Sequence, residues 1–514
     1  FGSRFAFFPS GPGIELHPIA KVATQMLSLG ALRMLSLATF ILYASVAAEE
    51  VCHGRDSCPG QSVGSSLLQT ASTASKMLSS SARAATIHGV PVLMGNFMGS
   101  FSSVYDDQQE WIVVMKQSGK TQGIVHSVCQ AASNCTAEEQ ALGMTVVHGT
   151  GRELEGLIAQ DPDAIQSLEL DVPCEAIPEL EGDPSLLEAG QVESWGLDRI
   201  DAREGLDNSY DAPADGGAGV HVYVTDTGVM VSHNDFGGRA IPTLEILGST
   251  TRVCQEGSTD CSDDVHGHGT HCAGTVGGTQ YGVAKGVTIH GVKTLSNSGG
   301  GQFSWWTRAL DWIVQNGLRP AVVSASLGGR GTHSFVQVAV DRTVEAGVTV
   351  IVAAGNSNAD ACQYSPAFVP SAITVAATSS NDARASFSSY GSCIDIFAPG
   401  VSIRSAGVSS NSDVTSKSGT SMACPHVAGA AALLLQSQST LNVTDGLVST
   451  ATENAVSNDM GSPNRLLYVT DAPAPAPPPA PSPGPAVLRG PPGPPGDQGP
   501  DGDAGTAGPP GPPG

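Results

Sequence analysis

Apolar residues recur with regular spacing in two regions of this chain, separated and flanked by stretches without periodicity. The first region, 110–177, has a strand-like run at 111–116, a helix-like pattern at 153–158 and an alternating run at 165–171. The stretch that begins Thr136-Ala-Glu-Glu-Gln has the form of a capping box, which predicts another helix. This spacing predicts a small α+β unit of about 65 residues.

The second region, 192–470, alternates β-branched runs with helix-like patterns. The strand-like runs are 220–224, 287–292, 321–326 and 348–353, and the helix-like stretches are 303–315 and 334–346. This order predicts a three-layer α/β domain with a mostly parallel central sheet. Ligands in such domains bind at the carboxyl ends of the strands, so polar residues there are candidates for function.

The stretches before the first region favour a secreted protein. Residues 1–25 are interpreted as upstream or fragment sequence, 26–48 as a signal peptide with small residues at its end, and 49–109 as a low-complexity leader. A membrane anchor is the alternative interpretation of the apolar run 35–46, but a membrane span needs about 20 residues. We therefore expect an extracellular protein with no membrane attachment after removal of the signal.

The end of the chain differs in composition. Residues 471–489 are rich in Pro and Ala and predict a stiff linker. Glycine then occupies every third position over 490–514, which is typical of the collagen triple helix. The repeat predicts a trimer through this tail. A gene-model join or a low-complexity tail remains an open alternative.

Charge and cysteine content narrow the class of protein further. The formal net charge of -24 disfavours nucleic acid as a partner. Eleven cysteines, most of them close in sequence to another, indicate an oxidising compartment. The close pairs are Cys52/Cys58, Cys129/Cys135, Cys254/Cys261 and Cys362/Cys393, which leaves Cys174, Cys272 and Cys424 over.

Three short segments carry the candidate chemistry. They are Val-Thr-Asp226-Thr-Gly, His-Gly-His268-Gly-Thr-His and Ser-Gly-Thr-Ser421-Met-Ala, in that order. Each alone has an ordinary structural explanation as a turn or a helix cap. Together they provide an acid, a base and a nucleophile, in a chain order known for one class of serine hydrolases. Ser421 would attack, His268 would take its proton, and Asp226 would orient the imidazole.

Two further features fit this chemistry. Pro425 is tolerated in the first turn of a helix, so a helix over 426–435 would place Ser421 near its positive N-terminal end. Asn356 follows the strand-like run 348–353 and is a candidate side-chain donor to the oxyanion, with the Ser421 N–H as the second donor.

A metal site is the alternative interpretation of the histidine-rich segment. It would use His266, His268, His271 and Cys272, but the sequence has no second cysteine cluster nearby and no His-Glu-x-x-His motif. We therefore expect no cofactor in catalysis.

Residues 192–470 resemble the subtilase family, and most closely its proteinase K branch. The resemblance rests on Trp195–Ile200, His268–Thr275, Tyr281–Lys285, Ser326–Gly329, Ala354–Asn358, Tyr364–Pro366 and Ser418–Gly429. It implies a subtilisin-like fold and a serine endopeptidase that works through an acyl-enzyme. His268 would be the base, and His271 would be structural.

The resemblance also implies how substrate is held. Two edge segments would bind it as an added strand, above a pocket with small lining residues that gives a broad preference for apolar side chains. The edges are Gly299, Gly300, Gly301, Gln302 and Phe303 together with Ser326, Leu327 and Gly328, and the pocket is lined by Ala353, Ala354 and Gly355.

A structural calcium ion and two thiols are further implications. The calcium site would consist of Asp395 and the carbonyls of Pro370 and Ala372, since calcium takes oxygen ligands. Cys272 resembles a free thiol beside the catalytic histidine, and Cys424 replaces the usual Thr or Ala and would be inert. The family resemblance also favours the pair Cys362/Cys393.

Residues 110–177 resemble the subtilase propeptide, which assists folding and then inhibits the enzyme. The maturation cut would lie between Ile177 and Val192. The partners expected are protein or peptide substrates and this propeptide. A structural or adhesive protein with a vestigial protease domain is the competing hypothesis, and the intact catalytic residues disfavour it.

Overall fold

The computed structural model describes residues 85–93, 106–116, 135–136, 142–159, 161–181, 194–211, 215–437 and 442–469. The elements below belong to the compact unit Thr86–Gly514, apart from the first residue of β1. The predicted signal peptide, the linker 471–489 and the collagen-like repeat lie outside the described residues.

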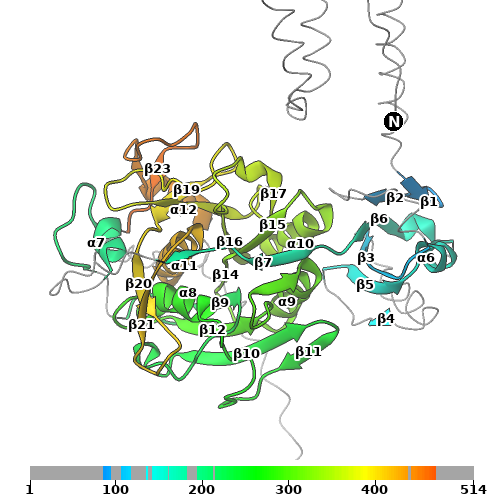
Figure 1. The fold of residues 1–514 in the computed structure, drawn as a ribbon, viewed down its shortest axis with the longest axis horizontal. Coiled ribbons are helices and arrows are strands. Elements are labelled where there is room, and N and C mark those ends of the chain that lie inside the picture. Colours follow the sequence, from blue (N-terminus) through cyan, green and yellow to red (C-terminus); the bar gives the residue numbers. More distant parts are fainter. Residues whose placement is uncertain are drawn as a thin grey trace, which may run out of the picture. The chain divides into compact units, whose positions relative to one another are not determined.

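A ten-stranded sheet forms the middle layer of the larger domain (Figure 1), in the order β11-β10-β12-β9-β14-β16-β18-β19-β23-β22. Only the edge pairs β10/β11 and β22/β23 are antiparallel, so the prediction of a mostly parallel sheet is confirmed. Its strands are β9 (His221–Asp226), β10 (Ala240–Leu247), β11 (Thr250–Val253), β12 (Thr288–Lys293), β14 (Ala321–Ala325), β16 (Val348–Ala353), β18 (Ile373–Thr378), β19 (Ile396–Pro399), β22 (Thr452–Glu453) and β23 (Arg465–Leu466).

Helices cover both faces of this sheet. They are α7 (Trp195–Asp201), α8 (His268–Gly277), α9 (Phe303–Asn316), α10 (Ser334–Glu345), α11 (Thr420–Ser437) and α12 (Val443–Thr450), with short 3₁₀ turns at Asn234–Phe236 and Ala361–Gln363. Along β9, Val222 and Val224 pack with residues of α8 and α11, whereas Tyr223 packs with residues of α9 and α10. Successive side chains of a strand point to opposite faces of the sheet. Because helices cover both faces, apolar residues occur along the whole length of a strand. None of the described helices has the length and apolar character needed to span a membrane.

A second, six-stranded sheet has the order β1-β2-β6-β3-β5-β4. Its elements are β1 (Ala85–Ile87), β2 (Val90–Leu93), β3 (Gln109–Met115), β4 (Cys135–Thr136), β5 (Met144–Gly149), α6 (Gly151–Ile158), the 3₁₀ turn Pro162–Ala164 and β6 (Ile165–Leu170). The structure differs here from two expectations. The low-complexity leader predicted over 49–109 contains β2, which pairs with β6. Thr136 belongs to a strand, and the residues 137–141 expected to follow it as a helix lie outside the described part.

Two acidic side chains at the end of β6 join the small sheet to the larger domain. The Glu169 carboxylate accepts hydrogen bonds from the N–H groups of Ser334 at 3.0 Å and Phe335 at 2.9 Å, at the start of α10. Asp171 Oδ1 accepts from the Ser304 N–H at 3.0 Å, at the start of α9. The first N–H groups of a helix lack partners within it and favour negative charge. These hydrogen bonds therefore give partners to N–H groups at the starts of α9 and α10, and they fix the position of the chain that follows β6.

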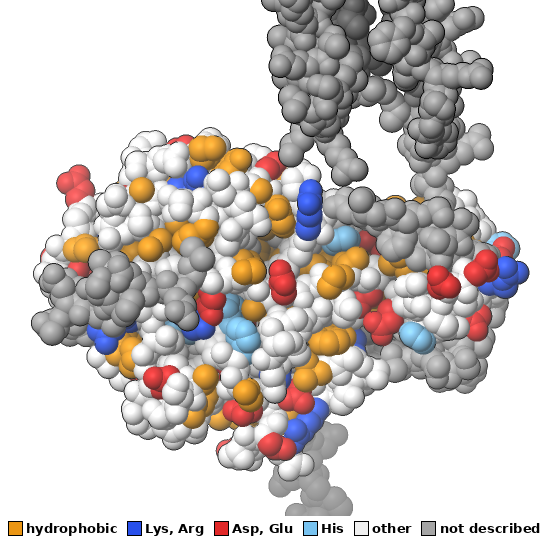
Figure 2. Space-filling view, in the orientation of Figure 1, with side chains coloured by type: hydrophobic (Ala, Val, Ile, Leu, Met, Phe, Trp, Pro, Cys, Tyr) orange, Lys and Arg blue, Asp and Glu red, His pale blue; other side chains and the backbone are white. Residues whose placement is uncertain are grey.

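Charged side chains are dispersed over the described part of the face shown in Figure 2. On the face shown in Figure 2, Lys and Arg occur singly, with Asp and Glu between them. A nucleic acid is bound by clustered basic residues, and this face offers no such cluster among its described residues. The distribution agrees with the acidic net charge of -24.

Candidate active site

Asp226 and His268 come from neighbouring elements at the carboxyl end of the sheet. Asp226 is the last residue of β9, and His268 is the first residue of α8. His268 Nδ1 and Asp226 Oδ1 lie 2.7 Å apart, and both side chains are fully buried. Burial alone would lower the pKa of His268, but the adjacent Asp226 carboxylate raises it above the usual value. The pair can therefore stabilise an imidazolium.

Gly269 permits the close approach of α8 to β9. A Cβ at this position would lie 2.2 Å from the carbonyl oxygen of Gly228 and 3.0 Å from the Asp226 Cβ. Any side chain here would push the histidine away from the aspartate.

Asp264 fixes the loop before the histidine, and the sequence analysis missed it. Its Oδ1 accepts hydrogen bonds from the Gly267 N–H and the Thr227 hydroxyl, both at 2.9 Å. Its Oδ2 accepts from the N–H and the hydroxyl of Thr270, at 2.8 and 2.7 Å. Asp264 therefore links the residue after Asp226 to the first turn of α8. The available signal was a carboxylate four residues before His268, in a turn that leads into a helix.

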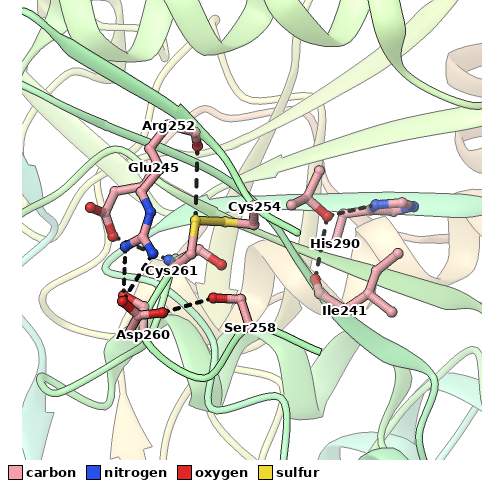
Figure 3. Close-up of a disulfide and its surroundings, with 10 residues drawn as sticks. Ile241, Glu245, Arg252, Cys254, Ser258, Asp260, Cys261 and His290 are labelled. Carbon is pink, nitrogen blue, oxygen red and sulfur yellow. Dashed lines mark hydrogen bonds and ion pairs between the residues drawn. A yellow bond between two sulfur atoms is a disulfide. The ribbon is translucent and has the colours of Figure 1, made fainter. Parts of the chain in front are cut away.

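A disulfide closes the segment that precedes this loop (Figure 3). Cys254 and Cys261 are joined, which confirms the pairing predicted from their spacing. Beside the bond, the Arg252 guanidinium donates to the Asp260 carboxylate at 2.9 Å. The N–H of the residue after Cys261 donates to Glu245 at 3.1 Å. These contacts anchor the chain that leads to Asp264.

The hydrogen bonds of the Ser421 carbonyl depend on the position of Pro425 in α11, which differs from the predicted position. We expected Pro425 in the first helical turn, but α11 begins at Thr420, so Pro425 lies inside the helix. Proline has no N–H and cannot bond the carbonyl four residues earlier, which is that of Ser421. This carbonyl instead accepts from the Ser326 hydroxyl at 3.0 Å and from the Cys272 thiol at 3.3 Å. Pro425 thus leaves the Ser421 carbonyl free to accept these two hydrogen bonds, which fix the backbone of Ser421 against the residue before β15 and against α8.

The reactive atoms of the site are buried and unpaired. Among the described residues, neither Ser421 Oγ nor His268 Nε2 has a hydrogen-bond partner. The predicted proton transfer would need a hydrogen bond between these two atoms, and such bonds often tighten only in the reacting complex.

The alternative metal interpretation finds little support. In the described part of the chain, the one grouping with metal-like spacing is Asp226, His268 and Cys272, whose candidate atoms lie within 4.8 Å of one another. The first two already form the acid–base pair. His271 Nε2 instead lies 3.0 Å from the Ile403 carbonyl oxygen, and burial lowers its pKa to about 3, which fits a structural, neutral histidine.

The remaining cysteines whose side chains the structure describes divide into a disulfide and buried thiols, and the predicted pairs Cys52/Cys58 and Cys129/Cys135 lie outside that part. Cys362 and Cys393 are joined, as expected. Cys174, Cys272 and Cys424 are free and buried. Burial raises the pKa of the Cys424 thiol to about 12 and that of Cys272 well above its usual range. Both therefore remain protonated and poorly reactive, since the thiolate is the nucleophile.

Asn356 is held so that its amide group points into the cleft. Its Oδ1 accepts hydrogen bonds from the N–H and hydroxyl of Thr420, both at 2.9 Å. This leaves Nδ2 as the donor, and it lies 2.7 Å from the carbonyl oxygen of Pro178. A Cβ at position 419 would lie 2.8 Å from this nitrogen, so Gly419 is needed beside it.

A strand of the chain itself occupies the predicted substrate edges. β7 (Pro173–Ala176) lies between β13 (Gly300–Gln302) and β15 (Leu327–Arg330) and is antiparallel to both. The Gly299 carbonyl oxygen also accepts from the N–H of Ala176 at 2.8 Å. The predicted edge residues are therefore brought together as strand partners.

Phe303 differs from the other predicted edge residues. Its side chain is fully buried in the core beside α9 and α10, and it contributes only its N–H, which donates to the Val172 carbonyl oxygen at 3.0 Å. It supports the edge through its backbone and cannot select a substrate side chain.

The chain continues past the site on the other side. The β7 segment is followed by Pro178, and then by β8 (Leu180–Glu181), which pairs with β21 (Val414–Ser418). β21 in turn pairs with β20 (Ile403–Ala406), and β15 pairs with β17 (Tyr364–Ser365). Glu179 forms an ion pair with Lys417. The segment 173–181 therefore crosses the cleft and is held on both sides of Ser421.

A pocket of about 320 Å³ opens beneath this segment. Its lining is mostly small or apolar, which favours apolar side chains. The residues are Glu175, Ile177, Pro178, Gly328, Gly329, Arg330, Ala353, Ala354, Gly355, Asn356, Ser357, Tyr364, Ser365 and Ala367. The three predicted pocket residues are among them.

Asp395 has the properties that a cation ligand needs. One oxygen accepts from the Thr374 N–H at 2.8 Å, and burial raises the pKa of its carboxyl group. A neighbouring cation would offset the cost of burying the charged Asp395 carboxylate and favour its ionised form. The calcium site formed by Asp395 and the carbonyls of Pro370 and Ala372 stays a prediction.

Comparisons with known proteins agree with this geometry. The Subtilase family model matches residues 217–467. The extracellular serine proteinase of Thermus sp. (strain Rt41A) is 44% identical over 374 residues, which cover 70% of this chain and 88% of that protein. The alkaline serine exoprotease A of Vibrio alginolyticus is 48% identical over 283 residues, and the match spans 51% of its length. The crystal structure of a cold adapted subtilisin-like serine proteinase is 49% identical, with a TM-score of 0.50, and the match covers 54% of this chain and 97% of that one.

The fold, the buried side chains of Asp226, His268 and Ser421, and the similarity to serine proteinases define a serine endopeptidase. The chain belongs to the subtilase family.

Proposed function

We propose that this chain is a secreted serine endopeptidase, of the proteinase K branch, that is made as an inhibited precursor and processes itself. The observation that carries the catalytic assignment is the buried 2.7 Å contact between His268 and Asp226, whose neighbour Cys272 donates to the Ser421 carbonyl. The names of its relatives, one of them an extracellular serine proteinase, support secretion.

Each side chain of the site has a distinct role in the proposed reaction. Ser421 Oγ attacks the carbonyl carbon of the substrate while His268 Nε2 takes its proton, and Asp226 stabilises the resulting imidazolium. The Asn356 amide and the Ser421 N–H stabilise the oxyanion. His268 then returns the proton to the leaving nitrogen as the C–N bond breaks. Water completes the cycle by hydrolysing the acyl-enzyme.

The cleft supports an endopeptidase that binds extended substrates. β13 and β15 offer hydrogen bonds to a strand on one side of Ser421, and β21 offers them on the other. A substrate bound by β-augmentation draws affinity from its backbone and specificity from its pockets. The small residues Ala353, Ala354 and Gly355 in the pocket support a broad preference for apolar side chains.

The precursor state is supported by the strand already in the cleft. Residues 173–176 occupy the substrate edges, and Glu169 and Asp171 attach the small sheet to α10 and α9. The small sheet with its trailing strand therefore acts as an inhibitory propeptide until it is cut and released.

Two accessory properties complete the proposal. A calcium ion bound by Asp395 and the carbonyls of Pro370 and Ala372 stabilises the fold. The collagen-like repeat 490–514 brings three chains together.

Casein cleavage by the wild type and by Ser421→Ala tests the function. Loss of cleavage in a folded Ser421→Ala protein is expected. Equal casein cleavage by the two proteins would contradict the assignment of Ser421, and absence of cleavage by the folded wild type would favour the competing hypothesis of a structural or adhesive protein.

A further inference from the structure

The register of the segment in the cleft identifies the peptide bond that faces Ser421. Along β15, the cleft-bound chain pairs Glu175 with Gly328 and Ala176 with Leu327. The next N–H, that of Ile177, donates to the Ser326 carbonyl oxygen at 3.3 Å. This contact makes Ile177 the last residue held by the edge, so the strand register places the Ile177–Pro178 bond at the nucleophile.

The oxyanion donor gives a second, independent position. Asn356 Nδ2 contacts the carbonyl oxygen of Pro178 at 2.7 Å, one residue further along the chain. By this contact the bond at the nucleophile is Pro178–Glu179. The two positions differ by one residue, but both bonds involve the same proline.

Neither the Ile177–Pro178 bond nor the Pro178–Glu179 bond can be hydrolysed readily in this site. For Ile177–Pro178, the leaving nitrogen belongs to a tertiary amide. The pyrrolidine ring places a carbon where the amide hydrogen would be and fixes φ, which obstructs the rotation that would turn the nitrogen lone pair toward His268. Without a proton from His268, the C–N bond does not break and the tetrahedral adduct returns to the intact peptide.

The Pro178–Glu179 bond fails for a different reason. A residue that provides the acyl group is held at the edge through its N–H, and proline has none. The Ser326 carbonyl oxygen is already bonded by the N–H of Ile177. Pro178 could replace Ile177 only by giving up this contact and shifting β7 by one residue, which turns every side chain to the other face.

We propose that Pro178 makes residues 173–181 a cleavage-resistant occupant of the enzyme's own cleft. The residue thus sets the specificity of self-processing, because the peptide bond that is best placed for attack is one that the enzyme cannot cut. The segment then remains an inhibitor after binding, and the maturation cut falls between Glu179 and Val192. This inference rests on the proposed precursor function.

The contacts around Pro178 favour retention of the intact segment. The Glu179–Lys417 ion pair and the β8–β21 pairing hold the chain on the far side of Ser421, while β13 and β15 hold it on the near side. A product that had been cut at this point would lose the connection between these two anchors.

The test compares full-length wild type, Pro178→Ala and the matched control Pro173→Ala, each also in the Ser421→Ala background. Pro173 lies at the far end of β7 and adjoins neither candidate bond. N-terminal sequencing and intact mass should show a new cut on the amino or carboxyl side of position 178 in Pro178→Ala alone. The cut should disappear when Ser421 is replaced. A wild-type cut at either bond would overturn the inference.

Peptides keep the test independent of folding. A synthetic peptide of residues 173–181 is incubated with processed wild-type enzyme, beside the same peptide with Ala at position 178. We expect the Ala peptide to be hydrolysed about 100-fold faster or more, since misplacement of reacting groups costs rates of that order, and the native peptide to inhibit casein cleavage. Equal hydrolysis of the two peptides would contradict the inference alone. Wild-type enzyme that cleaves neither casein nor the Ala peptide would contradict the proposed function.

Discussion

The carbonyl oxygen of Ser421 accepts hydrogen bonds from two side chains because Pro425, four residues later, has no N–H to offer it. A proline inside a helix usually weakens it, since it removes one backbone hydrogen bond. Here the freed acceptor is used by the Ser326 hydroxyl at 3.0 Å and the Cys272 thiol at 3.3 Å. The start of α11 is thereby fixed against Ser326, which precedes β15, and against Cys272 in α8.

Replacement of Pro425 tests this relationship. Pro425→Ala restores the N–H, which would compete for the Ser421 carbonyl and loosen the contact with Ser326. We expect a fall in kcat with little loss of stability, because alanine is a good helix former. Steady-state kinetics and thermal unfolding distinguish this outcome from simple destabilisation. An unchanged kcat would show that the freed carbonyl has no influence on the nucleophile.

The oxyanion role of Asn356 predicts a loss confined to the transition state. Removal of one such donor from a related serine peptidase lowers kcat by about 10²–10³-fold. Asn356→Ala should therefore reduce kcat with KM nearly unchanged, whereas Asn316→Ala, at the exposed end of α9, should match the wild type. A rise in KM without a change in kcat would assign Asn356 to ground-state binding instead.

The pH dependence follows from the Asp226–His268 pair. His268 acts as a base in its neutral form, and the carboxylate raises its pKa above the usual 6.5. Activity should therefore fall as the pH drops, with the acid limb of kcat/KM above pH 6.5 for the free enzyme. Asp226→Asn should move this limb to lower pH and reduce kcat by about 10⁴-fold, as in other serine proteases. An acid limb that does not move in the variant would show that His268 is not the group whose protonation causes the loss of activity.

Asp264 should matter for both stability and rate. It accepts five of the hydrogen bonds that hold the loop before His268. Asp264→Ala leaves buried donors without a partner, which should cost roughly 2–4 kcal/mol of unfolding free energy. Asp264→Asn keeps the shape and should recover part of the loss. Denaturant unfolding of the three proteins provides the ranking, and equal stabilities would contradict the role given to this carboxylate.

The two disulfides should differ in how much they contribute to the unfolding free energy. Cys254–Cys261 closes a loop of sequence separation 7, and Cys362–Cys393 closes one of 31. In the loop-entropy model these contribute about 2.5 and about 4 kcal/mol. The double serine variant at 362 and 393 should therefore lose more stability in denaturant unfolding than that at 254 and 261. The reverse order would point to native contacts, such as those beside Arg252, in place of chain entropy.

The sequence predicted the parallel sheet, the helices α9 and α10 and both described disulfides, because these depend on local periodicity and close spacing. Asp226, His268 and Ser421 could be proposed because three short motifs occur in one order, and Asn356 because it follows a strand-like run. Asp264 could not be singled out, since an aspartate in a loop has no pattern that distinguishes it before its five donors are placed. The start of α11 was predicted too late in the chain because proline usually stands in the first turn of a helix. Inside α11, Pro425 instead leaves the Ser421 carbonyl without its helical partner.

The position of residues 173–181 also lay beyond the sequence. Their strand partners are more than 100 residues away in β13, β15 and β21, and no local pattern specifies such pairing. Only the three-dimensional arrangement brings Pro178 to Asn356.

The most direct measurement of the central claim is covalent labelling with a fluorophosphonate probe, followed by mapping of the modified residue. The processed, folded enzyme should be labelled on Ser421, and labelling should vanish in Ser421→Ala and fall strongly in a variant with His268 replaced by Ala. Absence of labelling in correctly folded, processed enzyme, or modification of another residue, would contradict the assignment of Ser421 as the nucleophile of a serine endopeptidase.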